Sequence, residues 1–167
     1  MKKILPVEPP RFAVTMDIPK MAVIMGTPAV GDYYEMKAPA DATETACKMI
    51  ERYGVGDVPP LTETTAEEFL LRYTGALEEY RKTNLDVMMI PEKNSYDVGG
   101  HDDEFHIITS LQHMVYDYSG IDFGEQLEML VTEYWVLCAD AVKYSLQQTE
   151  KGREYLEDAY IDMHSRR

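Results

Sequence analysis

Long apolar runs are missing from this sequence, and so is a secretory signal. No stretch approaches the roughly 20 apolar residues that a membrane-spanning helix needs. Pro6, Pro9 and Pro10 interrupt the segment that follows Lys2 and Lys3, which leaves it without the apolar centre of a signal peptide. We therefore expect a cytoplasmic protein with no membrane partner.

Cysteine is also scarce, with only Cys47 and Cys138 in the chain. Small secreted domains use more cysteines and pair them. Both residues lie beside apolar neighbours inside helical patterns, which predicts two buried thiols in a reducing compartment. No histidine lies near Cys138 in the sequence, so a catalytic thiolate is not indicated there.

Positive charge is in short supply. The chain has 16 lysines and arginines against 30 aspartates and glutamates, which gives a formal charge of −14. A field of this sign repels phosphate backbones and anionic membrane surfaces, so we expect no direct contact with nucleic acid. It favours solubility and suits basic protein partners.

The common catalytic motifs are absent too. The turn Gly26–Gly31 lacks the Lys-Ser/Thr ending of a P-loop and the spacing of a dinucleotide fingerprint. No Gly-x-Ser-x-Gly elbow occurs. Adjacent acids such as Glu67 and Glu68 point apart on a helix, whereas glycoside chemistry needs two carboxylates that face each other. We therefore predict a protein that is not an enzyme and needs no cofactor.

One cluster has residue types that bind metals: His101, Asp102 and His106, with His113 beyond them. Asp102 and His106 have the four-residue spacing of two ligands on one helix, whereas His106 and His113 would lie about 10 Å apart. An acidic first turn that complements the helix dipole explains the same residues without a metal. We favour that interpretation and keep a metal hydrolase as an alternative.

The chain changes character near residue 40. Six of the nine prolines lie in residues 1–40, and proline cannot donate a hydrogen bond to a helix. Apolar residues alternate over 12–18 and run through 21–25, which predicts a β-hairpin, and residues 32–36 predict a third short strand. We expect a Pro-rich arm or β-hairpin over residues 1–40, packed on a helical domain over residues 41–167.

After residue 40 the apolar period becomes helical. Capping patterns at Asp41, Thr64 and Asp122 start helices, and Gly54 and Gly120 are placed to end them. The apolar stripes predict helices at about 41–53, 64–84, 103–118, 122–144 and 149–163, with the ring at position 118 on the core stripe of the third. The predicted fold is α+β and predominantly α: a bundle of about five helices with an N-terminal β-hairpin or extended arm.

Tyrosine is the aromatic residue in excess, twelve against four phenylalanines. Its large apolar body and polar tip suit interfaces, and eleven methionines add adaptable apolar surface. Aromatic residues concentrate in the last two predicted helices. We predict a protein interface formed by Tyr134, Trp135, Tyr144, Tyr155 and Tyr160; the alternative is that these rings fill a helical core.

The segment Ala139–Tyr160 combines a Tyr-rich helix, a Gln-Thr-Glu-Lys-Gly break at 148–152 and a Glu-Tyr-Leu helix at 154–156. It resembles the C-terminal ends of small acidic proteins encoded among the tail genes of bacteriophages and prophages, several of which are tail assembly chaperone-like. The resemblance covers about 22 of the 167 residues. It implies binding without catalysis, and it assigns no catalytic residue.

These observations favour a non-enzymatic, phage-derived protein that binds another protein during tail or virion assembly, in the host cytoplasm or in the virion. One alternative is a virion component that forms homo-oligomers through residues 1–40. Another is an acidic inhibitor that mimics DNA and blocks a host defence or DNA-binding protein.

Overall fold

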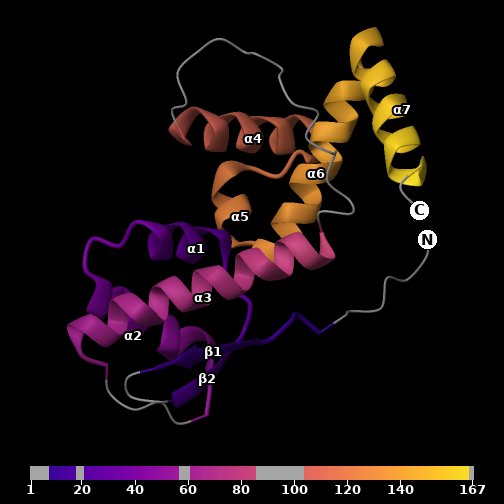
Figure 1. Cartoon of the computed structure of the whole chain (residues 1–167). Coiled ribbons are helices and arrows are strands. Elements are labelled where there is room, and N and C mark those ends of the chain that lie inside the picture. Colours follow the sequence, from indigo (N-terminus) through magenta and orange to yellow (C-terminus); the bar gives the residue numbers. More distant parts are fainter. Residues whose placement is uncertain (1–7, 18–20, 57–60, 86–103, 166–167) are drawn as a thin grey trace. The chain divides into compact units, whose positions relative to one another are not determined.

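The computed structural model describes residues 8–17, 21–56, 61–85 and 104–165, with side chains in the last segment described for 111–161. Within these ranges the chain forms seven helices and a three-stranded antiparallel sheet, so the predicted α+β, predominantly α class is confirmed (Figure 1). None of the described helices combines the length and the apolar character that crossing a membrane requires.

The chain divides into two compact units. Unit 1 contains residues 1–80 together with 127–132, and unit 2 contains residues 81–126 together with 133–167. The boundary that we expected at residue 40 therefore lies inside unit 1. The N-terminal hairpin and the helices that follow it share a core there, because Phe12 packs its ring against Tyr73 and Tyr80.

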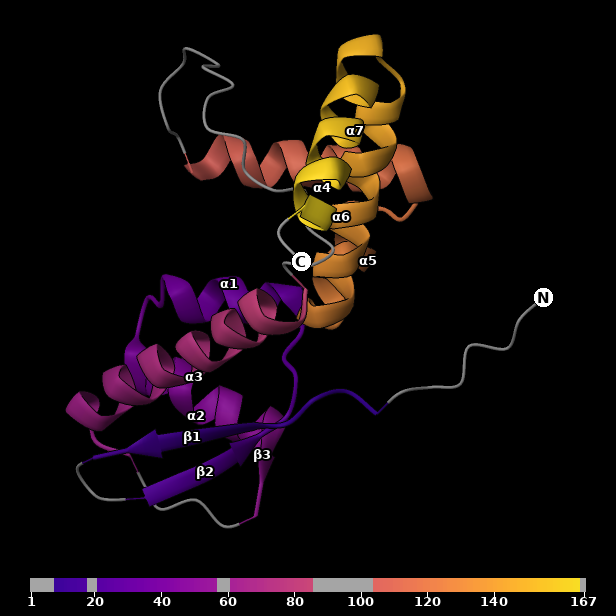
Figure 2. The same cartoon turned by 45° about the vertical axis from the view of Figure 1, so that its right-hand side comes forward.

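The sheet of unit 1 consists of β1 (Phe12–Met16), β2 (Met21–Met25) and β3 (Gly54–Val55), in the order β1-β2-β3. Val14 pairs with Val23 in the antiparallel register of the predicted hairpin. Residues 12, 14 and 16 are buried while 13 and 15 are exposed, as expected for a strand with one face on the core. Helices α1, α2 and α3 lie together beside this hairpin (Figure 2).

Helix α1 (Val30–Lys37) forms where we predicted a third strand over 32–36, and that prediction is wrong. Val30, Tyr33 and Met36 are buried at helical spacing. A segment this short does not distinguish a period of two from one of 3.6 by its apolar pattern. The Asp32 carboxylate favours the helix, because in this conformation it accepts hydrogen bonds from donors on the next helix.

Helix α2 (Ala42–Tyr53) begins as predicted, with the Asp41 carboxylate accepting a hydrogen bond from Glu44 N at 2.9 Å. It ends at Gly54, whose extended backbone continues into β3 and pairs with Met25. An added Cβ at Gly54 would lie 2.4 Å from the Ile50 carbonyl oxygen, so glycine is required by this close approach.

Helix α3 (Glu63–Asn84) carries the predicted apolar stripe into the core of unit 1. Phe69, Tyr73 and Leu77 are fully buried. The Tyr73 hydroxyl donates a 2.6 Å hydrogen bond to the Gly26 carbonyl oxygen, which satisfies a polar tip in an apolar interior. Burial raises the pKa of Tyr73 far above its ordinary value.

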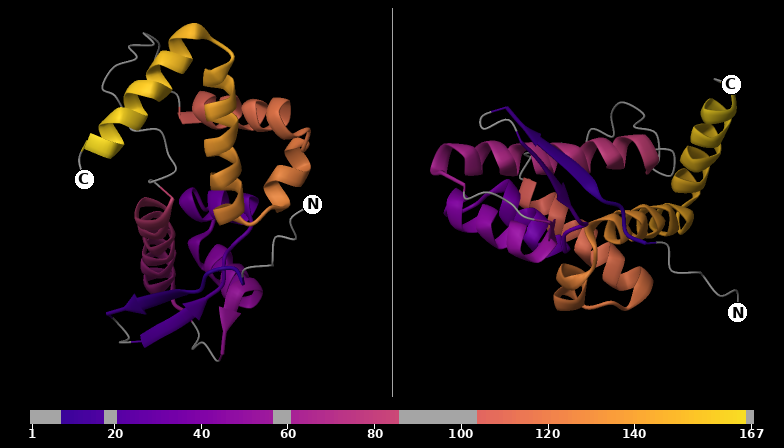
Figure 3. Two further views of the ribbon diagram at one scale, coloured as in Figure 1. Left: turned by 90° about the vertical axis from the view of Figure 1, so that its right-hand side faces the viewer. Right: turned by 90° about the horizontal axis from the view of Figure 1, so that it is seen from below.

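The remaining helices are α4 (Glu104–Ser119), α5 (Phe123–Glu128), α6 (Val131–Gln147) and α7 (Glu150–Ser165). The chain turns back between α6 and α7 (Figure 3), and the Thr149 hydroxyl caps α7 by accepting a hydrogen bond from Gly152 N.

The prediction of one helix over 122–144 is wrong, because residues 129 and 130 separate α5 from α6. Their backbone pairs elsewhere in unit 1: Val30 N donates to the Met129 carbonyl oxygen, and Val131 N donates to that of Pro28, both at 2.9 Å. A tertiary β-bridge between Ala29 and Leu130 thus takes up backbone groups that a continuous helix would use internally.

The two cysteines differ in environment. Cys138 is buried, and burial raises the pKa of its thiol to about 11, although a hydrogen bond with Tyr134 acts in the opposite direction. Cys47 is exposed, so the prediction of a buried thiol is wrong there. Its neighbours Ala46 and Met49 occupy the buried face of α2 and leave position 47 on the outer face.

We expect Gly54→Ala to destabilise the protein by about 1–3 kcal/mol, since its methyl group would overlap the Ile50 carbonyl oxygen. Gly75 is the matched control, because it lies in α3 with open space around an added Cβ. Gly75→Ala should stabilise by about 0.5–1 kcal/mol through better helix propensity. Denaturant unfolding of both variants tests this, and equal stability of Gly54→Ala and wild type would contradict it.

Candidate protein-binding surface

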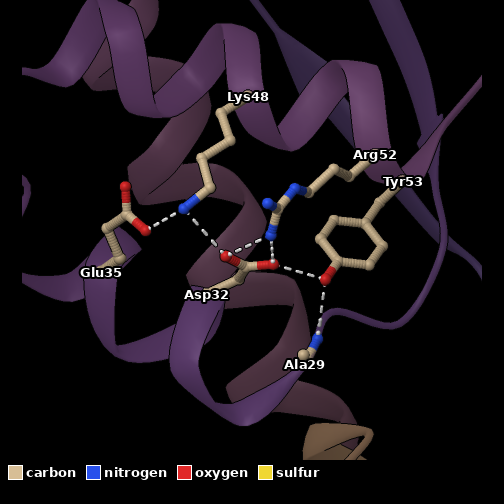
Figure 4. A network of polar contacts seen from close by, with 6 residues as sticks. All are labelled: Ala29, Asp32, Glu35, Lys48, Arg52 and Tyr53. Carbon is tan, nitrogen blue, oxygen red and sulfur yellow. Dashed lines mark hydrogen bonds and ion pairs between the residues drawn. The ribbon is translucent and has the colours of Figure 1, made fainter. Parts of the chain in front are cut away.

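The most extensive polar network of the described residues surrounds the carboxylate of Asp32 in unit 1 (Figure 4). Arg52 donates to both carboxylate oxygens, at 3.1 and 2.9 Å, and Lys48 Nζ lies 3.1 Å from Oδ1. The Tyr53 hydroxyl donates to Oδ2 at 2.5 Å and accepts a hydrogen bond from Ala29 N at 3.1 Å. Glu35 completes the network through an ion pair with Lys48.

The electrostatics of this network favour a permanently ionised carboxylate. Burial opposes ionisation of Asp32, but the hydrogen bonds from Tyr53, Lys48 and Arg52 outweigh it, so the pKa of Asp32 is lowered. The hydrogen bond to Glu35, assisted by Asp32, raises the pKa of Lys48. Burial and the Asp32 carboxylate both raise the pKa of Tyr53. These shifts stabilise the charged forms of Asp32 and Lys48 and the neutral form of Tyr53.

The Asp32 network links two helices. Both carboxylate oxygens accept hydrogen bonds from side chains of the neighbouring helix. Asp32 comes from the first turn of α1, where a negative charge complements the helix dipole, while its three donors come from α2. The arrangement fixes α1 on α2.

A second cluster, which we call the aromatic corner, lies in unit 2 and consists of His113, Tyr116, Tyr118, Phe123 and Tyr144. The Phe123 ring meets His113 and Tyr116 edge to face, with centroids 4.9 and 6.1 Å apart. Tyr118 of α4 contacts Tyr144 of α6 at 5.3 Å. These are two separate sets of contacting rings, Phe123 with His113 and Tyr116, and Tyr118 with Tyr144. Tyr116 and Tyr144 are 49% and 47% exposed. Several exposed rings on neighbouring elements mark a candidate interaction site.

Local backbone interactions hold the aromatic corner in shape. Gly120 ends α4 with φ +75°, a conformation that favours glycine. Asp122 and Glu125 then form a reciprocal capping box: Asp122 Oδ1 accepts from Glu125 N at 2.9 Å, and Glu125 Oε2 accepts from Asp122 N at 3.3 Å. The Ser119 hydroxyl bridges Val115 O and Ile121 N. The turn that presents Phe123 beside Tyr116 is therefore well ordered before any partner binds.

Gln126 joins the two helices beneath the corner. Its Nε2 donates to the carbonyl oxygens of Gln112 in α4 and Ile121 before α5, at 3.1 and 2.9 Å. Its side chain is fully buried, and among the described residues no donor reaches Oε1. Since both partners are acceptors, the position needs a donor with two N–H groups, which the amide supplies without burying a charge.

The charge around the aromatic corner has one dominant sign. Within unit 2, residues 113–126 and 133–144 contain five acidic side chains and one basic one, Lys143. Lys143 lies 3.7 Å from Asp140. A surface with exposed rings and surplus carboxylates is suited to lysine and arginine side chains, which pair with carboxylates and stack on aromatic faces.

The five rings predicted as an interface differ in their exposure to solvent. Tyr134 and Trp135 are buried, and Arg81 lies over the Trp135 ring at 5.7 Å. Tyr144 belongs to the aromatic corner, Tyr155 is half-buried, and Tyr160 on α7 is 64% exposed. The core alternative therefore describes Tyr134 and Trp135, and the exposed rings are the part of the prediction that an interface could use.

His101 and Asp102 lie outside the described residues, and His106 lies on α4 with its side chain outside the described set. The described side chains contain no group of three or more potential metal ligands. A metal at these residues remains an untested alternative.

Sequence patterns alone missed four members of the aromatic corner: His113, Tyr116, Tyr118 and Phe123. Tyr118 was assigned to a core stripe but is 41% exposed. One pattern in the sequence could have indicated them: Tyr116 and Tyr118 lie just before Gly120, which ends the helix, and before the capping box at Asp122. That signal places aromatic residues at a helix end, but it does not show which rings meet.

Comparison with protein-family models, with curated proteins and with solved structures finds no match for this chain.

We expect Asp32→Asn to destabilise the protein by about 1–3 kcal/mol at neutral pH, because Lys48 and Arg52 lose their shared anion. The pKa of Asp32 is lowered in the folded state, so its contribution is present above the ordinary value of 3.8 and is lost as pH falls through the lowered one. The difference between variant and wild type should therefore shrink as pH falls below 4. Denaturant unfolding across pH measures this.

Glu35→Gln is the control for Asp32→Asn. It removes a half-exposed partner of the same lysine and should cost less than about 1 kcal/mol. Equal losses for the two variants, or a difference for Asp32→Asn that does not change with pH, would contradict the role given to Asp32.

We expect Gln126→Glu to destabilise the protein more than Gln126→Met. Glutamate would direct a buried carboxylate at two carbonyl oxygens, at a cost of about 3 kcal/mol, whereas methionine loses two hydrogen bonds, at about 1–2 kcal/mol. Burial would raise the pKa of the new carboxyl group, so lower pH should restore part of the stability of Gln126→Glu alone. Unfolding at pH 7 and at about pH 5 tests both parts.

Proposed function

We propose that this protein is a non-enzymatic binding protein of a bacteriophage or prophage, which holds another protein during tail or virion assembly. The aromatic corner carries the binding part of the proposal. Its rings are exposed, and Phe123 contacts His113 and Tyr116 at a turn that is held by a capping box and by Gln126. Preorganised aromatic residues are the usual anchors of protein interfaces, since little conformational entropy is lost when they bind.

Charge supports a basic partner. The overall charge of −14 and the surplus of carboxylates around the aromatic corner steer lysine- and arginine-bearing segments toward it. An arginine could stack on Tyr116 or Phe123 while it pairs with a neighbouring carboxylate such as Asp117 or Asp122. This combination gives specificity without a catalytic group.

The phage assignment is supported by the resemblance of Ala139–Tyr160 to tail-gene proteins. The structure places this segment in α6, the connection after it and α7. Tyr144, a member of the aromatic corner, belongs to it. A chaperone-like role follows from binding without catalysis, because such a protein covers a client surface until assembly replaces it.

We expect Phe123→Ala to weaken binding of the partner by about 2 kcal/mol, roughly thirtyfold in Kd, because Phe123 is the central ring of the corner. A photo-crosslinking amino acid at Tyr116, in cells that express the phage genes, identifies the partner by mass spectrometry. Isothermal titration then compares wild type, Phe123→Ala and the control Val55→Thr, which alters an exposed apolar residue of unit 1.

The adducts distinguish the candidate functions. A tail or virion protein that binds Val55→Thr as wild type and Phe123→Ala weakly supports the proposal. Adducts with a nuclease or DNA-binding protein would favour the DNA mimic, and adducts between copies of this chain would favour the self-assembling virion component. If every variant of the aromatic corner still formed the tail-protein adduct, the surface assignment would be contradicted.

A further inference from the structure

Unit 1 carries a groove whose lining contains no aromatic residue, unlike the aromatic corner of unit 2. The groove has a volume of about 810 Å³ and is formed by the end of α1, the connection to α2 and the first half of α3. Its lining residues are Met36, Lys37, Pro39, Ala40, Asp41, Ala42, Thr43, Glu63, Glu67, Leu70, Leu71 and Thr74. The proposed function makes no use of it.

The apolar lining of the groove includes one large side chain that the fold leaves open. Met36 and Leu70 are 3% exposed and belong to the core, but the adjacent Leu71 is 72% exposed. Thr74, which also lines the groove, directs its hydroxyl to the backbone carbonyl oxygens of Leu70 and Leu71 and so leaves no free donor there. Leu71 thus presents an exposed apolar side chain beside the core residues of the groove.

The charges at the groove are mainly negative. Asp41, Glu63 and Glu67 contribute carboxylates, and Lys37 is the basic residue. Lys37 already pairs with Glu78 at 3.0 Å. The carboxylates therefore remain in excess, and an occupant must bring positive charge as well as apolar surface.

We propose that this groove binds an amphipathic segment of another protein, which places leucine-type side chains on Leu71 and lysine or arginine beside Glu63 and Glu67. The volume of the groove accommodates several side chains rather than one, and a docked helix would provide several. A second copy of this chain is disfavoured as the occupant, because each copy carries a charge of −14. This proposal does not rest on the aromatic corner.

A leucine–lysine peptide of about 14 residues, with leucines at helical spacing, serves as the probe. Two control peptides replace all lysines by glutamate or all leucines by serine. Backbone amide chemical shifts of the full chain locate the site, and fluorescence anisotropy of the labelled peptide gives Kd. We expect shifts to concentrate at residues 36–43 and 63–74, with weak binding of either control peptide.

Variants then separate the groove from other acidic surfaces. Leu71→Ser changes an exposed residue and should weaken the peptide about tenfold while leaving stability unchanged. The double variant Glu63→Gln and Glu67→Gln should weaken it several-fold and reduce its salt dependence. Phe123→Ala tests whether the basic peptide binds the aromatic corner instead: a peptide affinity that this variant leaves unchanged, together with the loss in Leu71→Ser, assigns the binding to the groove.

Three results would overturn the groove assignment: equal binding of the glutamate peptide, unchanged affinity of Leu71→Ser, or chemical shifts spread over all acidic faces. None of these results affects the crosslinks at Tyr116. The groove assignment can therefore be contradicted while the proposed function stands, and the reverse.

Discussion

The buried carboxylate of Asp32 determines how the helices of unit 1 assemble. It accepts hydrogen bonds from Arg52 and Tyr53 of α2, and an isolated charge in that position would be strongly unfavourable. The Tyr53 hydroxyl continues the network to Ala29 N. Ala29 in turn forms the β-bridge with Leu130, so the path from one carboxylate leads to the interruption between α5 and α6. The contacts that hold α1 on α2 are therefore connected, through Ala29, to the bridge that separates α5 from α6.

The two units handle polar groups and apolar surface differently. Unit 1 uses charges internally, to fasten α1 to α2, and buries most of its large apolar side chains. Unit 2 uses local backbone contacts, a capping box and one buried amide, and leaves several rings exposed at the aromatic corner. The turn at Gly120, with its positive φ, lies between Tyr116 and Phe123, whose rings contact each other.

Sequence patterns predicted one residue of the proposed binding surface, Tyr144, and there is a physical reason why they predicted no more. Tyrosine excess and acidic charge indicated an interface, and Tyr144 is indeed exposed. Tyr134 and Trp135 have the same residue types and a similar position in the chain, yet they are buried. Amphipathic aromatic residues suit a core and an interface equally, so residue type does not decide between the two. Only the packing of neighbouring helices does.

The sequence by itself determined the local features: the hairpin, the caps at Asp41 and Asp122, and the helix stop at Gly120. Each depends on interactions between residues a few positions apart, which composition and spacing encode directly. Tertiary structure decided that residues 30–37 form a helix, that residues 129–130 interrupt one, and that Cys47 is exposed. Those outcomes depend on partners that are distant in the chain, where hydrogen-bond donors and apolar neighbours become known only once the fold has formed.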